Sequence, residues 1–158
     1  EARQYKGDVM TNKLLRDDIV NQIKDVFDSQ LKNQVEILFF GSKEDCEHCE
    51  DTRQLVEEVS AISDKLHMSS YDLQDHAELA RQYHVSMAPG LVIAGKEADG
   101  IIDYGIRYAG IPSGYEFSSL IQDLVLVSGR DSGLAAETRA VLAELNKPVH
   151  LQVFVTPT

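Results

Sequence analysis

The chain has 158 residues, of which 43% are hydrophobic and 26% are charged, and its formal net charge is −11. This length favours one domain or two small ones, with enough apolar residues for one substantial core. The excess of carboxylates repels phosphate backbones, which argues against nucleic-acid binding. No apolar run approaches the roughly 20 residues of a membrane helix. The acidic charge, the sparse cysteine and the lack of a signal-peptide pattern predict a cytoplasmic protein.

The first half of the chain alternates between helical and extended patterns. The first apolar, β-branched and aromatic run ends at Gly41-Ser42, and Asp75 is the expected N-cap of the third helix. In chain order the expected elements are a helix over 11–31, a strand over 35–40, a helix over 46–63, a strand over 66–71 and a helix over 75–83.

The second half continues with two strands and a helix. A strand is expected over 90–94 and another over 104–111. Ser113 and Glu116 match a capping box, in front of a helix over 117–125. The resulting order, β-α-β-α-β-β-α behind an extra N-terminal helix, predicts an α/β fold with a mixed sheet flanked by helices.

A new pattern begins near residue 129. Apolar spacing predicts a helix over 134–145, which Pro148 stops, and a strand over 149–155. This order repeats the opening of the chain, although the two stretches share little residue identity. We therefore expect an N-terminal helical extension at 1–32, a main unit at 33–128, and the first helix and strand of a truncated second unit at 129–158.

The two cysteines of the chain, Cys46 and Cys49, form one C-x-x-C motif. A disulfide scaffold would spread its cysteines along the chain, and so small a ring stabilises little. Redox chemistry and metal binding remain as reasons to have the pair. A structural zinc site needs four ligands, and the sequence has no second C-x-x-C and no closely spaced histidine pair, so no metal is expected.

The expected strand–loop–helix order places Cys46 at a helix N-terminus. Unpaired N–H groups and the positive end of the helix dipole favour a thiolate there, so Cys46 is the candidate nucleophile. Cys49, one turn later, is the candidate resolving thiol. Between them, a protonated His48 would favour the thiolate, whereas Glu47 and its acidic neighbours oppose it. Acidic residues in a first helical turn also stabilise the helix. The acidic residues around the cysteines could therefore tune the reactivity of the thiols, select partners or stabilise the helix.

Met87-Ala88-Pro89 precedes the strand at 90–94, about forty residues after the C-x-x-C. This is where thioredoxin folds place a cis-proline, and a cis X-Pro bond usually marks a special turn. Such a bond would bring the backbone of Ala88 beside the cysteines, where it could pair with an extended substrate segment. The alternative is an ordinary trans proline that ends a loop.

Residues 105–117, GIRYAGIPSGYEF, resemble a signature of the two-unit protein disulfide oxidoreductases. These glutaredoxin-like proteins are built from two thioredoxin-fold units, and residues 145–158 resemble the start of their second unit, which a second C-x-x-C follows. The chain, which lacks an initiating Met, is thus expected to be a fragment. The resemblance implies that 33–128 is a thioredoxin-like unit, with Cys46 and Cys49 as its redox pair and Pro89 as its cis-proline.

The resemblance also implies what the protein works with. It predicts dithiol–disulfide exchange with protein thiols and disulfides, and electrons from a flavin-dependent thioredoxin reductase or from glutathione. No metal or organic cofactor is expected, because the cysteines carry the electrons. An unfinished second unit would leave a strand edge exposed, which predicts a homodimer.

Two alternatives stay open. The N-terminal region of the flavoprotein that reduces alkyl hydroperoxide reductase has a similar Gly-x-Pro-x-Gly-x-Glu-Phe segment, which suggests an electron-relay domain. Its first unit typically lacks cysteines, so Cys46 and Cys49 point away from it. The other alternative is a non-catalytic interaction module. No Trp precedes Cys46 and no Pro lies inside the motif, so no redox potential can be transferred from a relative.

Overall fold

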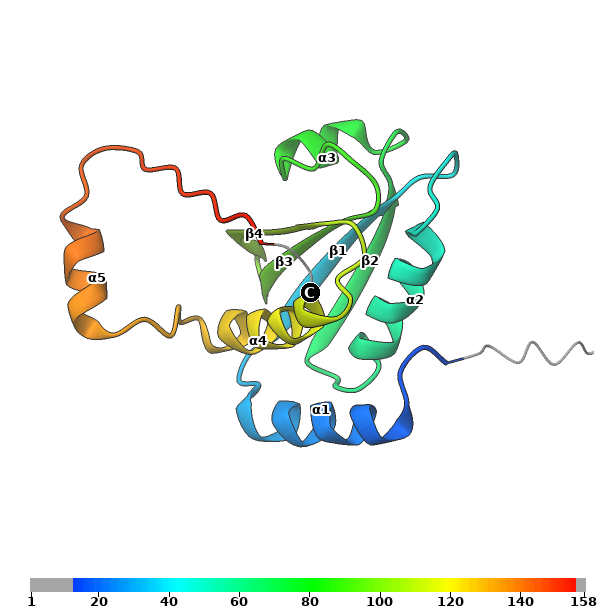
Figure 1. The fold of residues 1–158 in the computed structure, drawn as a ribbon, viewed down its shortest axis with the longest axis horizontal. Helices are drawn as coiled ribbons and strands as arrows, with labels where there is room; N and C mark the ends of the chain where they lie inside the picture. The colour runs from blue at the N-terminus through cyan, green and yellow to red at the C-terminus, as the bar shows by residue number, and fades with distance from the viewer. Residues whose placement is uncertain (1–12, 156–158) are drawn as a thin grey trace, which may run out of the picture.

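The computed structural model describes residues 13–155, and residues 11–12 of the first expected helix and the last three residues of the expected second unit lie outside this range. Four strands form one sheet in the order β2-β1-β3-β4 (Figure 1). The strands are β1 (Val35–Gly41), β2 (Leu66–Asp72), β3 (Gly90–Glu97) and β4 (Gly100–Ala109). β1 pairs with β2 in parallel and with β3 antiparallel, and β3 pairs with β4 antiparallel, so the predicted mixed sheet is confirmed.

The described residues also form helices, and all but the last of these cover the two faces of the sheet. They are α1 (Asp17–Gln30), α2 (Cys49–Ser60), α3 (Ala77–Gln82), α4 (Tyr115–Gly129) and α5 (Ala136–Ala143). Alternate side chains of β1 point to opposite faces. Ile37 and Phe39 pack in a core with α1, α2 and α4, whereas Leu38 and Phe40 pack in a smaller core with α3. Because β1 is buried on both faces, its sequence is continuously apolar except for Glu36.

Two expected helix caps are wrong. α3 begins at Ala77 with His76 as its N-cap and no side-chain cap, and Asp75 instead pairs with Lys43. At α4, Gly114 is the N-cap with a φ of 58°. Glycine adopts this positive φ without strain, and the helix begins after Gly114 and not after Ser113. The capping box between Ser113 and Glu116 therefore does not form.

The last expected strand is also wrong, and the one before it is shifted. β4 starts at Gly100, earlier than expected, because the turn after β3 lets the two strands pair along their whole length. The strand expected over 149–155 does not form, and its apolar residues are exposed. No neighbouring strand within residues 13–155 satisfies its backbone groups. α5 buries none of its own residues, and Figure 1 shows it standing away from the sheet.

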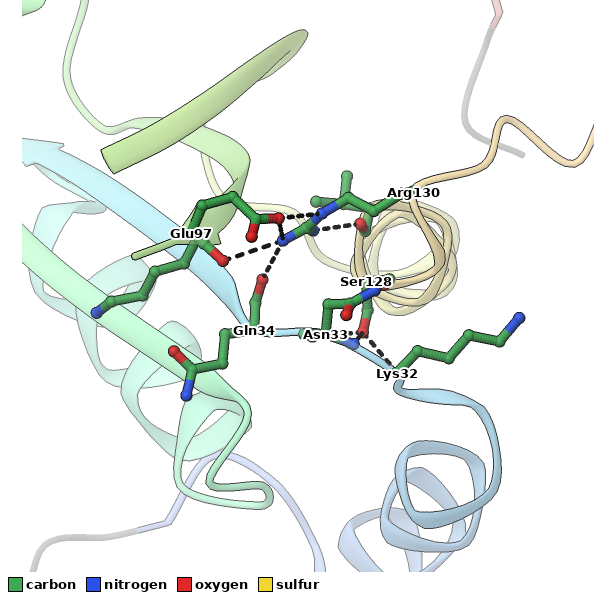
Figure 2. Close-up of polar contacts among 8 residues, drawn as sticks. Lys32, Asn33, Gln34, Glu97, Ser128 and Arg130 are labelled. Atoms are coloured by element: carbon green, nitrogen blue, oxygen red, sulfur yellow. Dashed lines mark hydrogen bonds and ion pairs between the residues drawn. The ribbon is translucent and has the colours of Figure 1, made fainter. Parts of the chain in front are cut away.

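A polar cluster closes the sheet at the end where β1 starts (Figure 2). The hydroxyl of Ser128 accepts hydrogen bonds from the N–H groups of Lys32 and Asn33, at 2.8 and 3.0 Å, and donates to the Asn33 carbonyl at 2.6 Å. The guanidinium of Arg130 donates to the carbonyl of Gln34 at 3.0 Å and to the carboxylate of Glu97 at 2.8 Å. We call this cluster the Ser128–Arg130 clasp. It ties the end of α4 to the residues just before β1 and to the end of β3.

Candidate active site

The cysteine motif lies at the other end of the sheet, where β1 ends. A disulfide joins Cys46 to Cys49, with their Cα atoms 5.4 Å apart. α2 begins at Cys49, three residues later than expected, and the N–H of Cys49 donates to the Cys46 carbonyl in the turn before the helix. Cys46 therefore precedes the helix, and both cysteines are half-buried.

The surroundings of Cys49 come from the end of β1. The Ser42 N–H donates a hydrogen bond to the Cys49 sulfur at 3.3 Å. A Cβ atom placed on Gly41 would lie 3.7 Å from that sulfur. Cys49 also packs against the main core, and a cavity of about 290 Å³ beside it is lined by Arg53 and Tyr71, among others. Cys49 is thus the inner cysteine of the pair.

The Ala88–Pro89 peptide bond is cis, as expected from the sequence. β1 and β3 pair with Phe40 opposite Gly90. Pro89 precedes Gly90, and Gly41, which lies near the Cys49 sulfur, follows Phe40, so both lie at the same end of this strand pair. The Gly110 N–H donates to the Pro89 carbonyl at 2.9 Å and holds this turn against the end of β4. The strand pairing therefore brings Cys49 and Pro89, forty positions apart in the sequence, to the same end of the sheet.

The backbone of Ala88, in the turn before β3, has no hydrogen-bond partner among the described residues. Its N–H and C=O form no hydrogen bond with any other residue in the part of the chain that the structure describes. Pro89 is buried, whereas Met87 is 56% exposed. Only glycine fits at position 90, because a Cβ there would lie 2.6 Å from Val85 and 2.9 Å from the Met87 carbonyl. Sequence reasoning missed Met87 and Gly90, because only the strand pairing shows how close this turn lies to the cysteines.

Charged groups around the cysteines divide into paired and unpaired ones. Lys43 binds Asp75 at 2.5 Å, which raises the pKa of Lys43. Arg53 binds Glu50 at 2.5 Å and also Glu57, and its hydrogen bond lowers the pKa of Glu50.

Four further acidic side chains are exposed and form no hydrogen bond or ion pair with another residue of 13–155. These residues are Glu44, Asp45, Glu47 and Asp51. His48 is also exposed, and although it is the N-cap residue of α2 its side chain forms no cap hydrogen bond. Glu47 and His48 therefore lie in the turn between the cysteines, open to solvent.

Two classes of feature are absent from residues 13–155. No group of three or more His, Cys, Asp or Glu side chains is arranged to hold a metal ion. None of the helices in this range has the length and apolar character needed to cross a membrane.

Comparison with known proteins gives a family match and several similar structures. A family model described as a thioredoxin domain matches residues 33–122. A protein disulfide oxidoreductase from Aeropyrum pernix is 25% identical with a TM-score of 0.70, and the match covers 82% of this chain and 55% of that chain. The N-terminal NTD N/C domain of the alkylhydroperoxide reductase AhpF from Enterococcus faecalis is 23% identical with a TM-score of 0.71, covering 82% and 60%. No curated protein sequence matches significantly.

These similarities confirm the fold expected from the sequence, a thioredoxin-like mixed sheet with an additional helix, α1, in front of β1. The chain spans little more than half the length of the two solved structures it matches, 55% and 60%.

Proposed function

Because the chain belongs to the thioredoxin-domain family, we propose that it is a thiol–disulfide oxidoreductase that exchanges its C-x-x-C dithiol and disulfide with protein substrates. The observation that carries this proposal is the Cys46–Cys49 disulfide at the start of α2, together with the cis bond before Pro89, at the start of the strand that pairs with β1. The similar solved structure titled a protein disulfide oxidoreductase supports it.

In the proposed reaction the reduced protein starts as a dithiol. The Cys46 thiolate attacks one sulfur of a substrate disulfide, forms a mixed disulfide and releases the other substrate sulfur as a thiolate, which takes up a proton. The Cys49 thiolate then attacks the Cys46 sulfur and releases the second substrate thiolate. Two electrons pass to the substrate, and the Cys46–Cys49 disulfide is formed.

The surroundings support this division of roles. Cys46 precedes α2, where the first amides of the helix favour negative charge. Cys49 is packed against the core, and the Ser42 N–H that now contacts its sulfur would stabilise its thiolate. Glu47 and His48 modulate the pair with opposite signs, because a carboxylate disfavours a nearby thiolate and an imidazolium favours it.

Ala88 and Pro89 bind the substrate backbone in this proposal. The free N–H and C=O of Ala88 can pair with an extended segment in the manner of an added strand. Such pairing would hold the substrate disulfide in line with Cys46. Electrons would come from a flavin-dependent thioredoxin reductase or from glutathione, and we place the protein in the cytoplasm.

We also propose that residues 129–158 begin a second thioredoxin-like unit, after the N-terminal extension at 1–32 and the redox unit at 33–128. The apolar residues of 149–155 are exposed, so they are available to pack against further secondary structure. The greater length of the two similar structures supports this organisation.

The exposed edge strand β4 supports a homodimer of the chain, because Ile101, Ile102 and Tyr104 on it are exposed. Light scattering at high concentration tests it, and a monomer would contradict it.

An electron-relay domain of a peroxide-reducing flavoprotein system is the second candidate. Residues 110–117 match the Gly-x-Pro-x-Gly-x-Glu-Phe segment of that flavoprotein, and the AhpF domain shares the fold. A relay predicts rapid exchange with a peroxidase disulfide and slow exchange with general substrates. A non-catalytic module instead predicts Cys46→Ser and Cys49→Ser variants that behave as wild type in every binding assay.

An equilibrium redox titration in glutathione buffers, read by thiol alkylation and mass, tests the main proposal. We expect one two-electron transition between roughly −120 and −270 mV, the range of redox catalysts. A pair that stays oxidised below about −300 mV would be structural and would overturn the proposal. In parallel, Cys49→Ser should accumulate a mixed disulfide on Cys46, whereas Cys46→Ser should accumulate none.

A further inference from the structure

We propose that the Cys46–Cys49 site selects cationic polypeptide segments as its redox partners. This inference rests on the proposed disulfide exchange and names the partner class for it. The surface consists of the disulfide, the turn formed by Met87 and Ala88, and four carboxylates that we call the acidic rim. The acidic rim consists of Glu44, Asp45, Glu47 and Asp51.

The acidic rim lies close to the reacting sulfurs. Each of its residues is within two positions of Cys46 or Cys49, so its Cα lies within about 7.6 Å of a cysteine Cα. The Debye length is about 8 Å at physiological ionic strength, so these charges act on a partner that approaches the disulfide. All four side chains are exposed, so a partner can contact them directly.

The chain does not neutralise the acidic rim itself. The two permanent cations of this loop and helix start are engaged elsewhere, Lys43 with Asp75 and Arg53 with Glu50 and Glu57. No rim side chain forms an ion pair or hydrogen bond with another residue in 13–155. Lys and Arg side chains of a partner would therefore supply the missing counter-charges.

A second feature favours a polypeptide partner over a small thiol. The unpaired N–H and C=O of Ala88 suit an extended backbone. Met87, 56% exposed beside it, offers an adaptable apolar contact for a partner side chain. Glutathione carries a net negative charge, so the acidic rim repels it. Of the two electron sources proposed above, the acidic rim thus disfavours glutathione, and the site favours a basic protein segment as its partner.

The test uses the full 158-residue chain, reduced with a small dithiol and then desalted. Each of three synthetic peptides contains the same intramolecular disulfide. The peptides differ only in the residues that flank it, which are lysines in the first, serines in the second and glutamates in the third. Reduction is followed by acid quench, alkylation and mass. We expect the lysine peptide to react at least about tenfold faster than the glutamate peptide at low salt. The ratio should approach one near 1 M salt, where the Debye length is about 3 Å.

Variants assign the effect to the acidic rim. In the rim variant Glu44→Gln, Asp45→Asn, Glu47→Gln and Asp51→Asn are combined, and the lysine-to-glutamate ratio should fall toward one. The ratio is the readout because removing carboxylates also favours the Cys46 thiolate and so changes the rate with every peptide. A matched variant removes the same charge from exposed positions away from the disulfide, and its ratio should stay near wild type. It combines Asp25→Asn, Asp99→Asn, Glu137→Gln and Glu144→Gln.

The outcomes separate this inference from the function on which it rests. If the serine peptide is not reduced, the proposed function fails and the inference fails with it. If that peptide is reduced but the lysine and glutamate peptides react equally fast at low salt, only the inference is overturned. It is also overturned if the matched variant lowers the ratio as much as the rim variant does.

Discussion

Residues 13–130 and residues 131–155 carry comparable apolar patterns but have different surroundings. In α4 the apolar side chains at helical spacing are buried, and Leu120 and Leu124 are fully shielded. In α5 the same spacing leaves Leu142 46% exposed, and every residue from 131 to 150 is exposed. A helix can form from local hydrogen bonds, but burial needs a partner surface. The comparison shows that periodicity predicts an element and says nothing of what covers it.

The Ser128–Arg130 clasp marks where the packed region ends. Up to Arg130, side chains of α4 bond to the start of β1 and the end of β3 (Figure 2). After it, the side-chain hydrogen bonds of 131–155 stay within that segment, as in the pair of Asp131 with Arg139. The segment therefore gains little stability from the packed region, and matched substitutions in the two regions can measure the difference.

The largest expected difference comes from one leucine substitution made in each region. Leu124→Ala opens a cavity in the main core and should lower the free energy of unfolding by about 3 kcal/mol. Leu142→Ala removes the same atoms from an exposed position and should change it by less than about 0.5 kcal/mol. Urea unfolding followed by circular dichroism measures both. A cost above about 1 kcal/mol for Leu142→Ala would show that α5 packs against something in solution.

The same contrast explains how much of the fold could be predicted. The order of elements up to α4 follows from apolar spacing, because most of these elements bury apolar side chains in the two cores, with the edge strand β4 as the exception. The strand expected over 149–155 fails for the opposite reason, since a strand needs a neighbour that residues 13–155 do not supply. Boundaries failed where backbone geometry decides, as at Gly114.

The residue types of the candidate site could be predicted from the sequence, but the details of its geometry could not. The cysteine spacing indicated the disulfide, and the proline at position 89 indicated the cis bond once it was taken together with the strand, C-x-x-C and helix before it. Three details depend on the conformation of the loops that follow or precede the strands. They are the start of α2 at Cys49, the exposure of Met87 and the contact of Ser42 with the Cys49 sulfur. No periodicity encodes those details, so they had to come from the structure.

A smaller difference is expected for two serines, one in the clasp and one just after it. Ser128→Ala removes a buried hydroxyl that serves the backbone of Lys32 and Asn33, and it should cost about 2 kcal/mol because those groups lose their partner. Ser132→Ala removes only a long contact to the Leu134 N–H, at 3.4 Å, and should have almost no effect. The same urea experiment compares them. Equal costs would mean that the clasp is not the boundary of the packed region.

The smallest effect concerns two aspartates in the same local arrangement, one in each region. Asp103 accepts hydrogen bonds from Arg107 and the Gly105 N–H, and Asp131 accepts them from Arg139 and the Gly133 N–H. The arginine bond is the main cause that lowers the pKa of Asp103 and that of Asp131, the latter to about 2. A lowered carboxyl pKa stabilises the folded arrangement above the ordinary pKa. That stabilisation is lost as the pH falls through the lowered value.

Salt should separate the two aspartates. The Asp131 side chain is 52% exposed and the Asp103 side chain 33%, so 1 M salt should screen the first ion pair more and move the Asp131 pKa further toward the ordinary value of 3.8. Carboxyl-carbon NMR titrations between about pH 1.5 and 5, at low and high salt, measure both midpoints, a range that brackets ordinary and lowered carboxyl values. Arg139→Gln should raise the Asp131 midpoint and leave Asp103 unchanged. An Asp131 midpoint near 3.8 at low salt would show that residues 131–155 do not hold this pair in solution. Equal salt shifts would instead mean that Asp131 is as sheltered as Asp103, and the contrast between the two regions would then be one of packing alone.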